Sequence, residues 1–354
     1  MKPLPLVPLA SRLVALVAGA TLLAGCLPSR VVIDLAPRDG ELTETAVISD
    51  DGANALSPKV ALIAVEGVLS ENPAPAGLIQ TRTNPVDRLV TQLERADADD
   101  RVKAVVLRID SPGGTVSASE TLYNELARFR ARTNKPIVVS MGGVAASGGY
   151  YIALAGDELV AQESTITGSI GVLIQTFNVA EGLRQIGIVA PAVTSGPNKD
   201  VANPLEPLRD EQYAVLEDLV DEFYDAFTAN VREHRPDVTD WSLATDGRVV
   251  TGPRALELGL VDSIGGIREA FTRAKTLADL DRAHLVRYHD AGTTVNSAYA
   301  RTFDPSGTNQ LSWPDGERTQ AGVFAGGTQV NLIQVNLPAG LWSTPGVYYL
   351  WAGW

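Results

Sequence analysis

The sequence predicts an α/β protein built around a parallel β-sheet, and three observations support this. Residues 60–65 (VALIAV) and 102–109 (VKAVVLRI) are apolar runs of strand length, rich in β-branched residues. A third such run covers residues 136–141 (PIVVSM). The segments between the runs repeat apolar residues at helical spacing. Strands and helices that alternate in this way indicate right-handed βαβ units, and hence a parallel sheet covered on both faces.

The first two predicted helices have definable starts and apolar faces. Asn84 and Pro85 open the first helix. Its apolar face comprises Val86, Leu89, Val90 and Leu93. We expect Ser117 or Ser119 to cap the second helix. The apolar face of that helix comprises Leu122, Leu126 and Phe129.

Two further helices are expected after the third strand. A short apolar helix should end near Ala155, and a long amphipathic helix should follow Pro207. We expect the apolar stripe of the long helix to lie in the core. Its members are Tyr213, Leu216, Leu219, Val220, Phe223 and Phe227.

Composition excludes several classes of protein. The 354 residues are 45% hydrophobic, enough for a sizeable core, and carry a net charge of −13. That acidic balance argues against a nucleic-acid surface, which needs clustered Lys and Arg. A single cysteine excludes an internal disulfide framework and a zinc site built on several thiolates. Only three histidines are present, so no metal site is predicted.

The N-terminus reads as a secretory signal, residues 1–25, that ends at a candidate lipidation site. Lys2 and Arg12 supply a positive n-region ahead of an apolar stretch, residues 13–23, that is too short to cross a bilayer. The following Leu-Ala-Gly-Cys sequence resembles a bacterial lipobox, in which Cys26 would be acylated. The alternative is an ordinary signal peptide with a chance cysteine. We expect a lipid-anchored protein of the bacterial cell envelope on the periplasmic side. Leu27, rather than Asp, follows the cysteine, which favours the outer membrane.

The rest of the chain divides into three parts. Residues 26–57 are polar and read as a tether, and residues 58–290 contain the predicted α/β pattern. Residues 291–354 form a C-terminal extension of unknown role, rich in Gly, Pro, Ser and Thr. Within the extension, residues 329–336 (QVNLIQVN) resemble a strand, and residues 348–354 are rich in aromatics.

Two glycine-rich segments follow predicted strands, where parallel sheets place their ligands. In residues 110–114 (DSPGG), the N–H groups of Gly113 and Gly114 can approach a ligand closely and form an oxyanion hole. A plain turn before a helix is the alternative. In AASGGYY, Ser147 opens a helix, whose N-terminus favours developing negative charge. The alternative for Ser147 is an ordinary helix cap.

A serine nucleophile needs a base, and no histidine falls at a suitable place in the pattern. Lys199, in TSGPNKD, can serve if removal from water leaves its amine uncharged. Taken alone, a lysine in a Gly- and Pro-rich loop is more often a solvated surface residue.

Together these segments resemble the SppA-type signal peptide peptidases. The resemblance covers residues 58–275 and rests on four motifs and a longer fifth segment. In chain order these are DSPGG, ASGGYYIA (146–153), TITGSIGV (165–172), SGPNKD (195–200) and GRVVTGPRALELGLVD (247–262). The resemblance implies a Clp/crotonase-like fold, with stacked ββα units around a parallel sheet.

By position in these motifs, Ser147 corresponds to the family's nucleophile and Lys199 to its general base. The N–H groups around Gly113 and Gly114 correspond to the oxyanion donors, and Ser169 to a residue that orients the lysine. Ser169 could instead be a turn residue at a strand end. The resemblance implies ring-shaped homo-oligomers, often octamers, whose neighbours complete each substrate groove. Pro197 is a local variation in the lysine loop that could shift Lys199 relative to Ser147.

The sequence therefore predicts a membrane-tethered serine endopeptidase with a Ser147/Lys199 dyad and no metal or cofactor. The resemblance implies cleaved signal peptides and other small or unfolded peptides as substrates. One alternative is a catalytically silent peptide-binding or scaffold lipoprotein of the same fold, although such a protein would need neither residue of the dyad. A second is a crotonase-like acyl-CoA enzyme, but secretion separates the chain from that cytoplasmic cofactor.

Overall fold

A mostly parallel sheet forms the centre of the molecule. The computed structural model describes residues 42–71, 84–290, 295–300 and 347–350. Within these residues, nine strands make one sheet with the main order β1-β11-β2-β3-β5-β6-β10. The strands are β1 (Leu42–Ser49), β11 (His284–Asp290), β2 (Lys59–Glu66), β3 (Val102–Ser111), β5 (Ile137–Ala146), β6 (Glu158–Ala161) and β10 (Ser263–Ile264). The remaining two, β7 (Ile166–Gly168) and β9 (Val249–Thr251), extend the sheet from the carboxyl end of β5.

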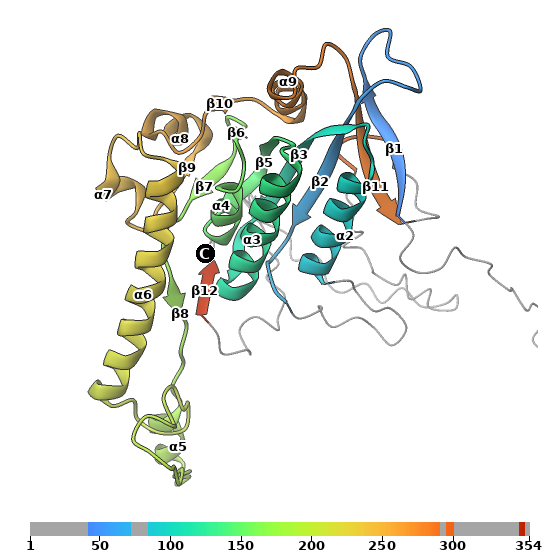
Figure 1. Ribbon diagram of the computed structural model, residues 1–354. Helices are drawn as coiled ribbons and strands as arrows, with labels where there is room; N and C mark the ends of the chain where they lie inside the picture. Colours follow the sequence, from blue (N-terminus) through green and yellow to red (C-terminus); the bar gives the residue numbers. More distant parts are fainter. Residues whose placement is uncertain (1–41, 72–83, 291–294, 301–346, 351–354) are drawn as a thin grey trace, which may run out of the picture. The chain divides into compact units, whose positions relative to one another are not determined.

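Helices cover both faces of this sheet. On one face lie α2 (Pro85–Ala98), α3 (Val116–Thr133) and α4 (Gly148–Ala153), side by side in Figure 1. On the other face lies α9 (Ile267–Leu277), against β2, β3, β5 and β6. Alternate residues of β2 face opposite sides of the sheet. Ile63 packs on the side of α2 and α3, and Leu62 packs on the side of α9. The predicted α/β fold with a parallel sheet is confirmed.

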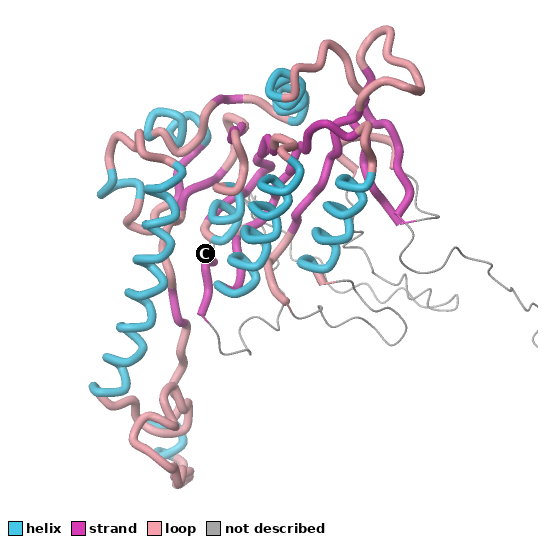
Figure 2. Tube along the Cα trace, viewed as in Figure 1, coloured by secondary structure: helices cyan, strands magenta, loops and turns pink. Residues whose placement is uncertain are grey.

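The remaining helices follow β8 (Leu173–Ile174) in the chain. Figure 2 shows that the chain around the short helix at the lower end of the view is mostly loop. They are α5 (Ala180–Gln185), α6 (Asp210–His234), α7 (Trp241–Ala244) and α8 (Gly252–Leu258). None of the described helices combines the length and the apolar character that a membrane crossing needs. The predicted signal segment and the strand-like residues 329–336 lie outside the described residues.

The folded part of the chain begins earlier than predicted. Residues 42–49, expected to belong to the tether, form β1 and pair antiparallel with β11, from Leu42 opposite Asp290 to Ser49 opposite His284. β1 is an edge strand of mixed polarity (LTETAVIS) and is only half-buried. Such a strand lacks the continuous apolar run that marks the central strands, so the sequence pattern did not show it.

A different residue from the two expected caps helix α3. The N-cap is Thr115, whose side chain accepts a hydrogen bond from the N–H of Ala118. Ser119 lies inside the helix and donates its hydroxyl proton to the carbonyl of Thr115. Three hydroxyl residues lie within five positions here, and only the backbone geometry distinguishes among them.

The apolar stripe of α6 is only partly in the core. Phe227 and Val231, toward its C-terminus, are fully buried. Toward its N-terminus, Tyr213 is 51% exposed and Leu219 is 37% exposed. The prediction that the whole stripe lies in the core was therefore wrong for the first half of this helix.

A second, three-stranded sheet has the order β4-β12-β8. Its strands are β4 (Gly113–Thr115), β12 (Val347–Leu350) and β8 (Leu173–Ile174). The central strand, β12, comes from the C-terminal extension and is antiparallel to both neighbours.

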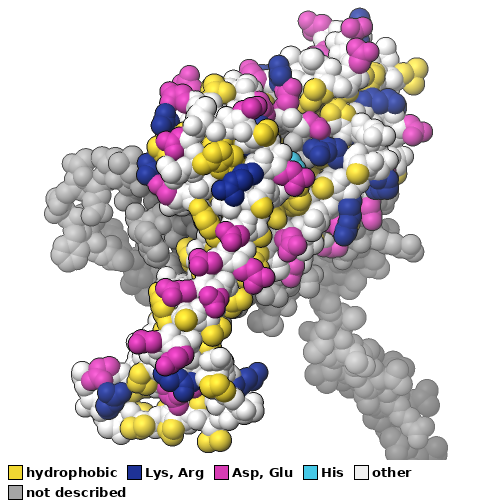
Figure 3. Space-filling view, turned by 60° about the vertical axis from the view of Figure 1, so that its left-hand side comes forward, with side chains coloured by type: hydrophobic (Ala, Val, Ile, Leu, Met, Phe, Trp, Pro, Cys, Tyr) yellow, Lys and Arg dark blue, Asp and Glu magenta, His cyan; other side chains and the backbone are white. Residues whose placement is uncertain are grey.

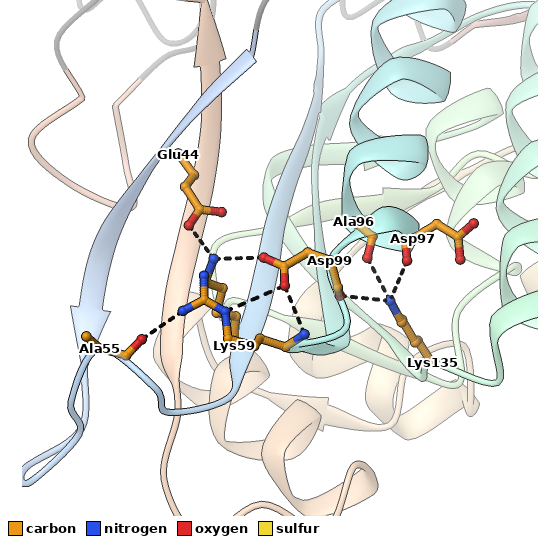
Figure 4. Close-up of polar contacts among 8 residues, drawn as sticks. Glu44, Ala55, Lys59, Ala96, Asp97, Asp99 and Lys135 are labelled. Carbon is orange, nitrogen blue, oxygen red and sulfur yellow. Dashed lines mark hydrogen bonds and ion pairs between the residues drawn. The ribbon is translucent and has the colours of Figure 1, made fainter.

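A buried ion-pair network joins β1, β2 and the end of α2 (Figure 4). Lys59, only 4% exposed, donates to the carboxylates of Glu44 and Asp99, the latter at 2.8 Å. The N–H of Arg101 donates to the other oxygen of Asp99 at 2.9 Å. Lys135 donates to the carbonyl of Ala96, at the C-terminal end of α2. The network thereby fixes the edge strand β1 to the core of the sheet.

Asp99→Asn should lower the free energy of unfolding by about 2 kcal/mol near neutral pH, because Lys59 loses a charged partner inside the protein. Partial desolvation acts to raise the pKa of Asp99, but hydrogen bonds from Lys59 and the Arg101 N–H hold that pKa below its ordinary value of 3.8. A lowered folded-state pKa stabilises the fold above the unfolded-state value, and this contribution disappears as pH falls through the folded-state value. Urea unfolding at about pH 7 and about pH 3 measures both effects.

Asp100→Asn is the matched control, because Asp100 is the exposed neighbour of Asp99. It should leave stability nearly unchanged at both pH values. A loss of stability in Asp99→Asn that is equally large at both pH values would contradict the assigned role of the carboxylate.

Candidate active site

Ser147 lies in a strained turn between β5 and α4. Its backbone has φ 53° and ψ −117°, a conformation that residues with a Cβ rarely adopt. The side chain makes no capping hydrogen bond to α4, although Ser147 occupies the N-cap position. Its hydroxyl is buried, with no hydrogen-bond partner among the residues that the structure describes. The alternative of an ordinary capping serine is therefore not supported.

Neighbouring main chain holds this turn in place. The N–H of Ser147 donates to the carbonyl of Gly168 at 2.8 Å, and the carbonyl of Ser147 accepts from the N–H of Tyr151 at 2.8 Å. The hydroxyl of Tyr150, a fully buried residue of α4, donates to the carbonyl of Leu260 at 2.8 Å. The strained conformation is thus determined by bonds to two other segments of the chain.

The glycine-rich loop after β3 packs directly against the turn. A methyl group on Gly148 would lie 2.4 Å from Ser119 Oγ and 3.2 Å from the nitrogen of Gly114. A methyl group on Gly149 would lie 2.6 Å from the carbonyl oxygen of Ser111. Only glycines permit this approach of main chain to main chain. The structure thereby places Gly113 and Gly114 against Gly148, the residue that follows Ser147.

The two candidate oxyanion donors differ in their surroundings. Gly113 has φ 105°, and its N–H donates to Ser111 Oγ at 3.1 Å. Its carbonyl accepts from the N–H of Leu69, and the carbonyl of Leu69 accepts from the N–H of Thr115. Because N–H and C=O groups alternate between the edges of a strand, the N–H of Gly114 faces the edge opposite Leu69.

Ser169 is also part of this cluster. Gly168, which accepts from the N–H of Ser147, precedes it directly in the chain. Ser169 has φ 51°, is buried, and donates its N–H to the carbonyl of Arg248 at 2.7 Å. Ser169 therefore lies next to the turn at Ser147, in the left-handed conformation.

Lys199 is not brought to Ser147 within one chain. It is exposed and lies in the segment between α5 and α6, whereas Ser147 immediately precedes α4. Figure 1 shows α5 and the start of α6 well apart from α4. The structure therefore places Ser147, Gly113, Gly114 and Ser169 together and leaves Lys199 apart from them.

The loop that carries Lys199 is nonetheless ordered by α6. The side-chain N–H groups of Gln212 donate to the carbonyl of Pro197 at 3.1 Å and to the Asp200 carboxylate at 2.7 Å. Arg209 also donates to Asp200, at 3.0 Å. Gln212, in the first turn of α6, is buried, whereas the other residues of the N-terminal half of this helix are exposed or only partly buried. Sequence reasoning missed Gln212, because only its burial identifies it as a support for this loop.

Ser111 was likewise missed as a positioning residue. It is fully buried at the end of β3, and its Oγ accepts the hydrogen bond from the Gly113 N–H. A polar residue directly after an apolar strand was the available signal. Among the described residues, no group of three or more His, Cys, Asp or Glu could hold a metal ion.

Comparison with known proteins identifies the family of the chain. Residues 130–281, which include Ser147 and Lys199, match the model of peptidase family S49, and residues 79–168 match that of Clp protease. Over 224 residues the chain is 36% identical to "Putative protease slr0021" of Synechocystis, which covers 63% of this chain and 76% of that protein. Over 260 residues it is 32% identical to "Putative signal peptide peptidase SppA" of Enterococcus faecium, covering 73% and 74%. The chain belongs to peptidase family S49.

This S49 peptidase is also 39% identical to "Protease 4" of Salmonella typhi over 213 residues. The match covers 59% of this chain and only 34% of the Salmonella protein. Membership confirms the predicted SppA-type resemblance and makes the chain a serine peptidase by class. The Clp protease match agrees with a Clp/crotonase-like arrangement of the parallel sheet.

In this S49 peptidase, Ser147→Gly should be more stable to unfolding than Ser147→Ala by about 1 kcal/mol. Both variants lose the hydroxyl, but only glycine relieves the strained backbone, and its freedom in the unfolded chain offsets part of that gain. Chemical denaturation of the two proteins gives the difference directly.

Gly148→Ala, at the next residue, should instead destabilise the protein. The added methyl group has no space beside Ser119 and Gly114, so we expect a loss of about 2 kcal/mol. If Ser147→Gly were less stable than Ser147→Ala, the backbone at this turn would not be strained.

Proposed function

We propose that the protein is a serine endopeptidase in which Ser147 is the nucleophile and Lys199 is the general base. The observation that carries the proposal is the buried Ser147 hydroxyl, which has no hydrogen-bond partner among the described residues and lies in a strained turn beside a glycine loop. Strain of this kind persists only where the surrounding structure enforces it, and it is concentrated at functional sites. A strained strand-to-helix turn is also how other hydrolases expose a nucleophilic serine.

The reaction follows from the groups present. The uncharged amine of Lys199 accepts the proton of Ser147 Oγ as Oγ bonds to the substrate carbonyl carbon, and the carbonyl oxygen becomes the oxyanion. The N–H of Gly114 stabilises that oxyanion. The intermediate collapses, the C–N bond breaks, and the lysine ammonium gives its proton to the leaving amine. A water molecule, deprotonated by Lys199, then hydrolyses the acyl ester and Ser147 regains its proton.

A second copy of the chain supplies Lys199. Lys199 is exposed in one chain, and the part of the chain that the structure describes offers the Ser147 hydroxyl no other hydrogen-bond partner. Residues 173–222, here called the arm, carry Lys199 and many exposed apolar side chains. These include Phe177, Ile186, Val189, Val193 and Tyr213. Apolar side chains are visible on the lower lobe in Figure 3, below a row of acidic side chains.

Exposed apolar surface of this kind favours association between chains. In our proposal the arm packs on a neighbouring copy, excludes water from Lys199 and favours its uncharged form. Repetition of one head-to-tail contact closes a ring, and we propose a homo-oligomeric ring of as many as eight chains.

The proposed substrates are cleaved signal peptides and other small or unfolded peptides. The buried position of Ser147 supports this choice, because only an extended segment can bring its carbonyl to a hydroxyl so deep in the fold. The Enterococcus relative, 32% identical, carries the name of a signal peptide peptidase, which supports the same class of substrate.

We further propose that acyl chains on Cys26 anchor the protein in the cell envelope, on the periplasmic side and in the outer membrane. The support is the Leu-Ala-Gly-Cys sequence after an apolar segment, with Leu27 in the next position. Cys26 itself lies outside the described residues.

Ser147→Ala and Lys199→Ala should each reduce peptide hydrolysis by about a thousandfold or more, because each removes a member of the dyad. Assemblies that contain both variants should recover about a quarter of wild-type activity, since Ser147 from one chain and Lys199 from the next meet at that frequency. Two affinity tags allow the mixed assemblies to be purified and assayed with a fluorogenic peptide.

Each variant mixed with itself is the control and should stay inactive. Mixed assemblies as inactive as their parents would show that Lys199 does not act on a neighbour. Wild-type turnover in Lys199→Ala alone would remove this residue from the mechanism.

Cys26→Ser should release the protein from the membrane fraction and abolish labelling by a radioactive fatty acid, because the acylated thiol is lost. Leu27→Asp is the matched variant: it keeps the cysteine and should move the protein from the outer to the inner membrane. Membrane fractionation on a density gradient measures both. Unchanged labelling in Cys26→Ser would exclude lipidation at this residue.

A further inference from the structure

Helix α6 connects the core of the molecule to the loop that carries Lys199. Its C-terminal end, residues 227–235, here called the root, contributes buried side chains to the core. Its N-terminal end holds the loop through the side chain of Gln212, which donates to the carbonyl of Pro197. Figure 1 shows α6 as a long helix that leads away from the core toward α5. The position of Lys199 relative to the core therefore depends on how the root is held.

The length of α6 amplifies any movement at the root. At about 1.5 Å per residue, the 25 residues of Asp210–His234 span about 37 Å. A tilt of about 5° at the root would displace the first turn by about 3 Å over that length. In an enzyme, a misplacement of about 1 Å can already reduce turnover about a hundredfold. A base carried on such a helix needs an anchor that fixes direction as well as distance.

An ion pair between Arg235, the C-cap of α6, and Asp262 provides such an anchor. Arg235 Nη1 donates to Asp262 Oδ1 at 2.7 Å, and Nη2 donates to Oδ2 at 3.0 Å. Only 11% of the Arg235 side chain is exposed. Asp262 is itself tied to β6, because its Oδ2 accepts from the N–H of Leu159 at 2.7 Å. Two parallel hydrogen bonds fix the plane of the guanidinium, so the pair defines the direction in which α6 leaves the core.

The segment that holds the root also holds the helix of the candidate nucleophile. The carbonyl of Leu260, two residues before Asp262, accepts the hydrogen bond from the Tyr150 hydroxyl at 2.8 Å. Tyr150 is fully buried in α4, which Ser147 precedes directly. Residues 260–262 therefore link α6 to the turn at Ser147.

Aromatic side chains support the root from the side of α3 and α4. The rings of Phe227 and Tyr151 meet edge to face, with centroids 5.1 Å apart. A hydrogen bond of 3.1 Å joins the Tyr123 hydroxyl and His234 Nε2. Ring contacts tolerate a range of angles, whereas a bidentate ion pair does not. The direction of α6 thus depends chiefly on the pair between Arg235 and Asp262.

We infer that Arg235 and Asp262 are positioning residues for the reaction: their ion pair sets the direction of α6 and thereby brings Lys199 to the Ser147 hydroxyl of a neighbouring chain. The inference deepens the proposed function and rests on it, because it takes Lys199 as the base. Neither residue of the pair belongs to the cluster around Ser147, so both act through the helix.

Arg235→Gln should lower kcat for a fluorogenic peptide about tenfold or more and change KM less than about twofold, because only the base is displaced. Arg235→Lys keeps the charge without the two parallel bonds, so its kcat should lie between those of the wild type and Arg235→Gln. Arg254→Gln is the matched control, because it breaks an exposed ion pair with Glu257 on α8 and should change neither constant. A kcat in Arg235→Gln equal to that of the control would overturn the inference.

Asp262→Asn tests whether the two residues act as one unit. Asparagine keeps an oxygen that can accept from the Leu159 N–H, but it lacks the charge that pairs with Arg235. Asp262→Asn should therefore lower kcat as Arg235→Gln does, and the double variant should be no slower than the slower single variant. Losses that multiply in the double variant would contradict a shared role.

Mixed assemblies show which member of the dyad Arg235 positions. When Ser147→Ala chains assemble with Lys199→Ala chains, the working site takes Lys199 from the first chain and Ser147 from the second. Arg235→Gln added to the Ser147→Ala chain should reduce the recovered activity about tenfold or more. The same substitution added to the Lys199→Ala chain should leave the recovered activity nearly unchanged. The reverse pattern, or equal losses in both, would overturn the inference.

A distance measurement separates this inference from the proposed function. Nitroxide labels on Glu211→Cys, in the first turn of α6, and on Glu163→Cys, in the exposed loop after β6, report the direction of the helix. Cys26→Ser removes the other thiol, and unlabelled chains dilute the labelled ones to one per assembly. Double electron–electron resonance should give a broader distance distribution in Arg235→Gln than in the protein with Arg235 intact. Broadening would support the anchor even if the wild type hydrolysed no peptide. An unchanged distribution would refute it even in an active peptidase.

Discussion

Close main-chain packing between two glycine pairs is the constraint on which the site depends. Gly148 and Gly149 at the start of α4 press against Ser111, Gly113 and Gly114, with no room for a Cβ at either position. This contact joins the ends of β3 and β5, so the glycine loop and the serine turn cannot move independently. We attribute the strained backbone of Ser147 to this contact, because the glycine loop fixes the point at which helix α4 can begin. The sheet therefore holds the glycine loop and the serine turn in fixed positions relative to each other.

Much of this arrangement could be predicted from the sequence, because the signals are local. The strands at 60–65, 102–109 and 136–141 have continuous apolar character, and the motifs around Gly113 and Ser147 follow them directly. Thr115 was missed as a cap because three hydroxyl residues compete at that point and only the backbone decides among them. β1 was missed because an edge strand of mixed polarity resembles a polar tether.

The rest could not be predicted, because it depends on segments far apart in the chain. Spacing along the sequence cannot show that Lys199 remains exposed while Ser147 is buried. Nor can it show that residues 347–350 pair with residues 113–115, because strand pairing depends on the three-dimensional fold and not on the order of the strands in the sequence. The α6 stripe illustrates the same limit. Its apolar residues do recur at helical spacing, yet Tyr213 and Leu219 remain partly exposed to solvent in the described part of one chain.

The pairing of β1 with β11 has a mechanical consequence. β1 is the first described element of the chain, and seven residue pairs join it to β11, with Lys59 adding an ion pair to Glu44. A pull on the chain ahead of Leu42, directed along this strand, loads the whole ladder in shear rather than opening it bond by bond. A force applied there would therefore act first on the outer strand β1 and on its pairing with β11, before it reached the inner strands that carry the serine turn and the glycine loop.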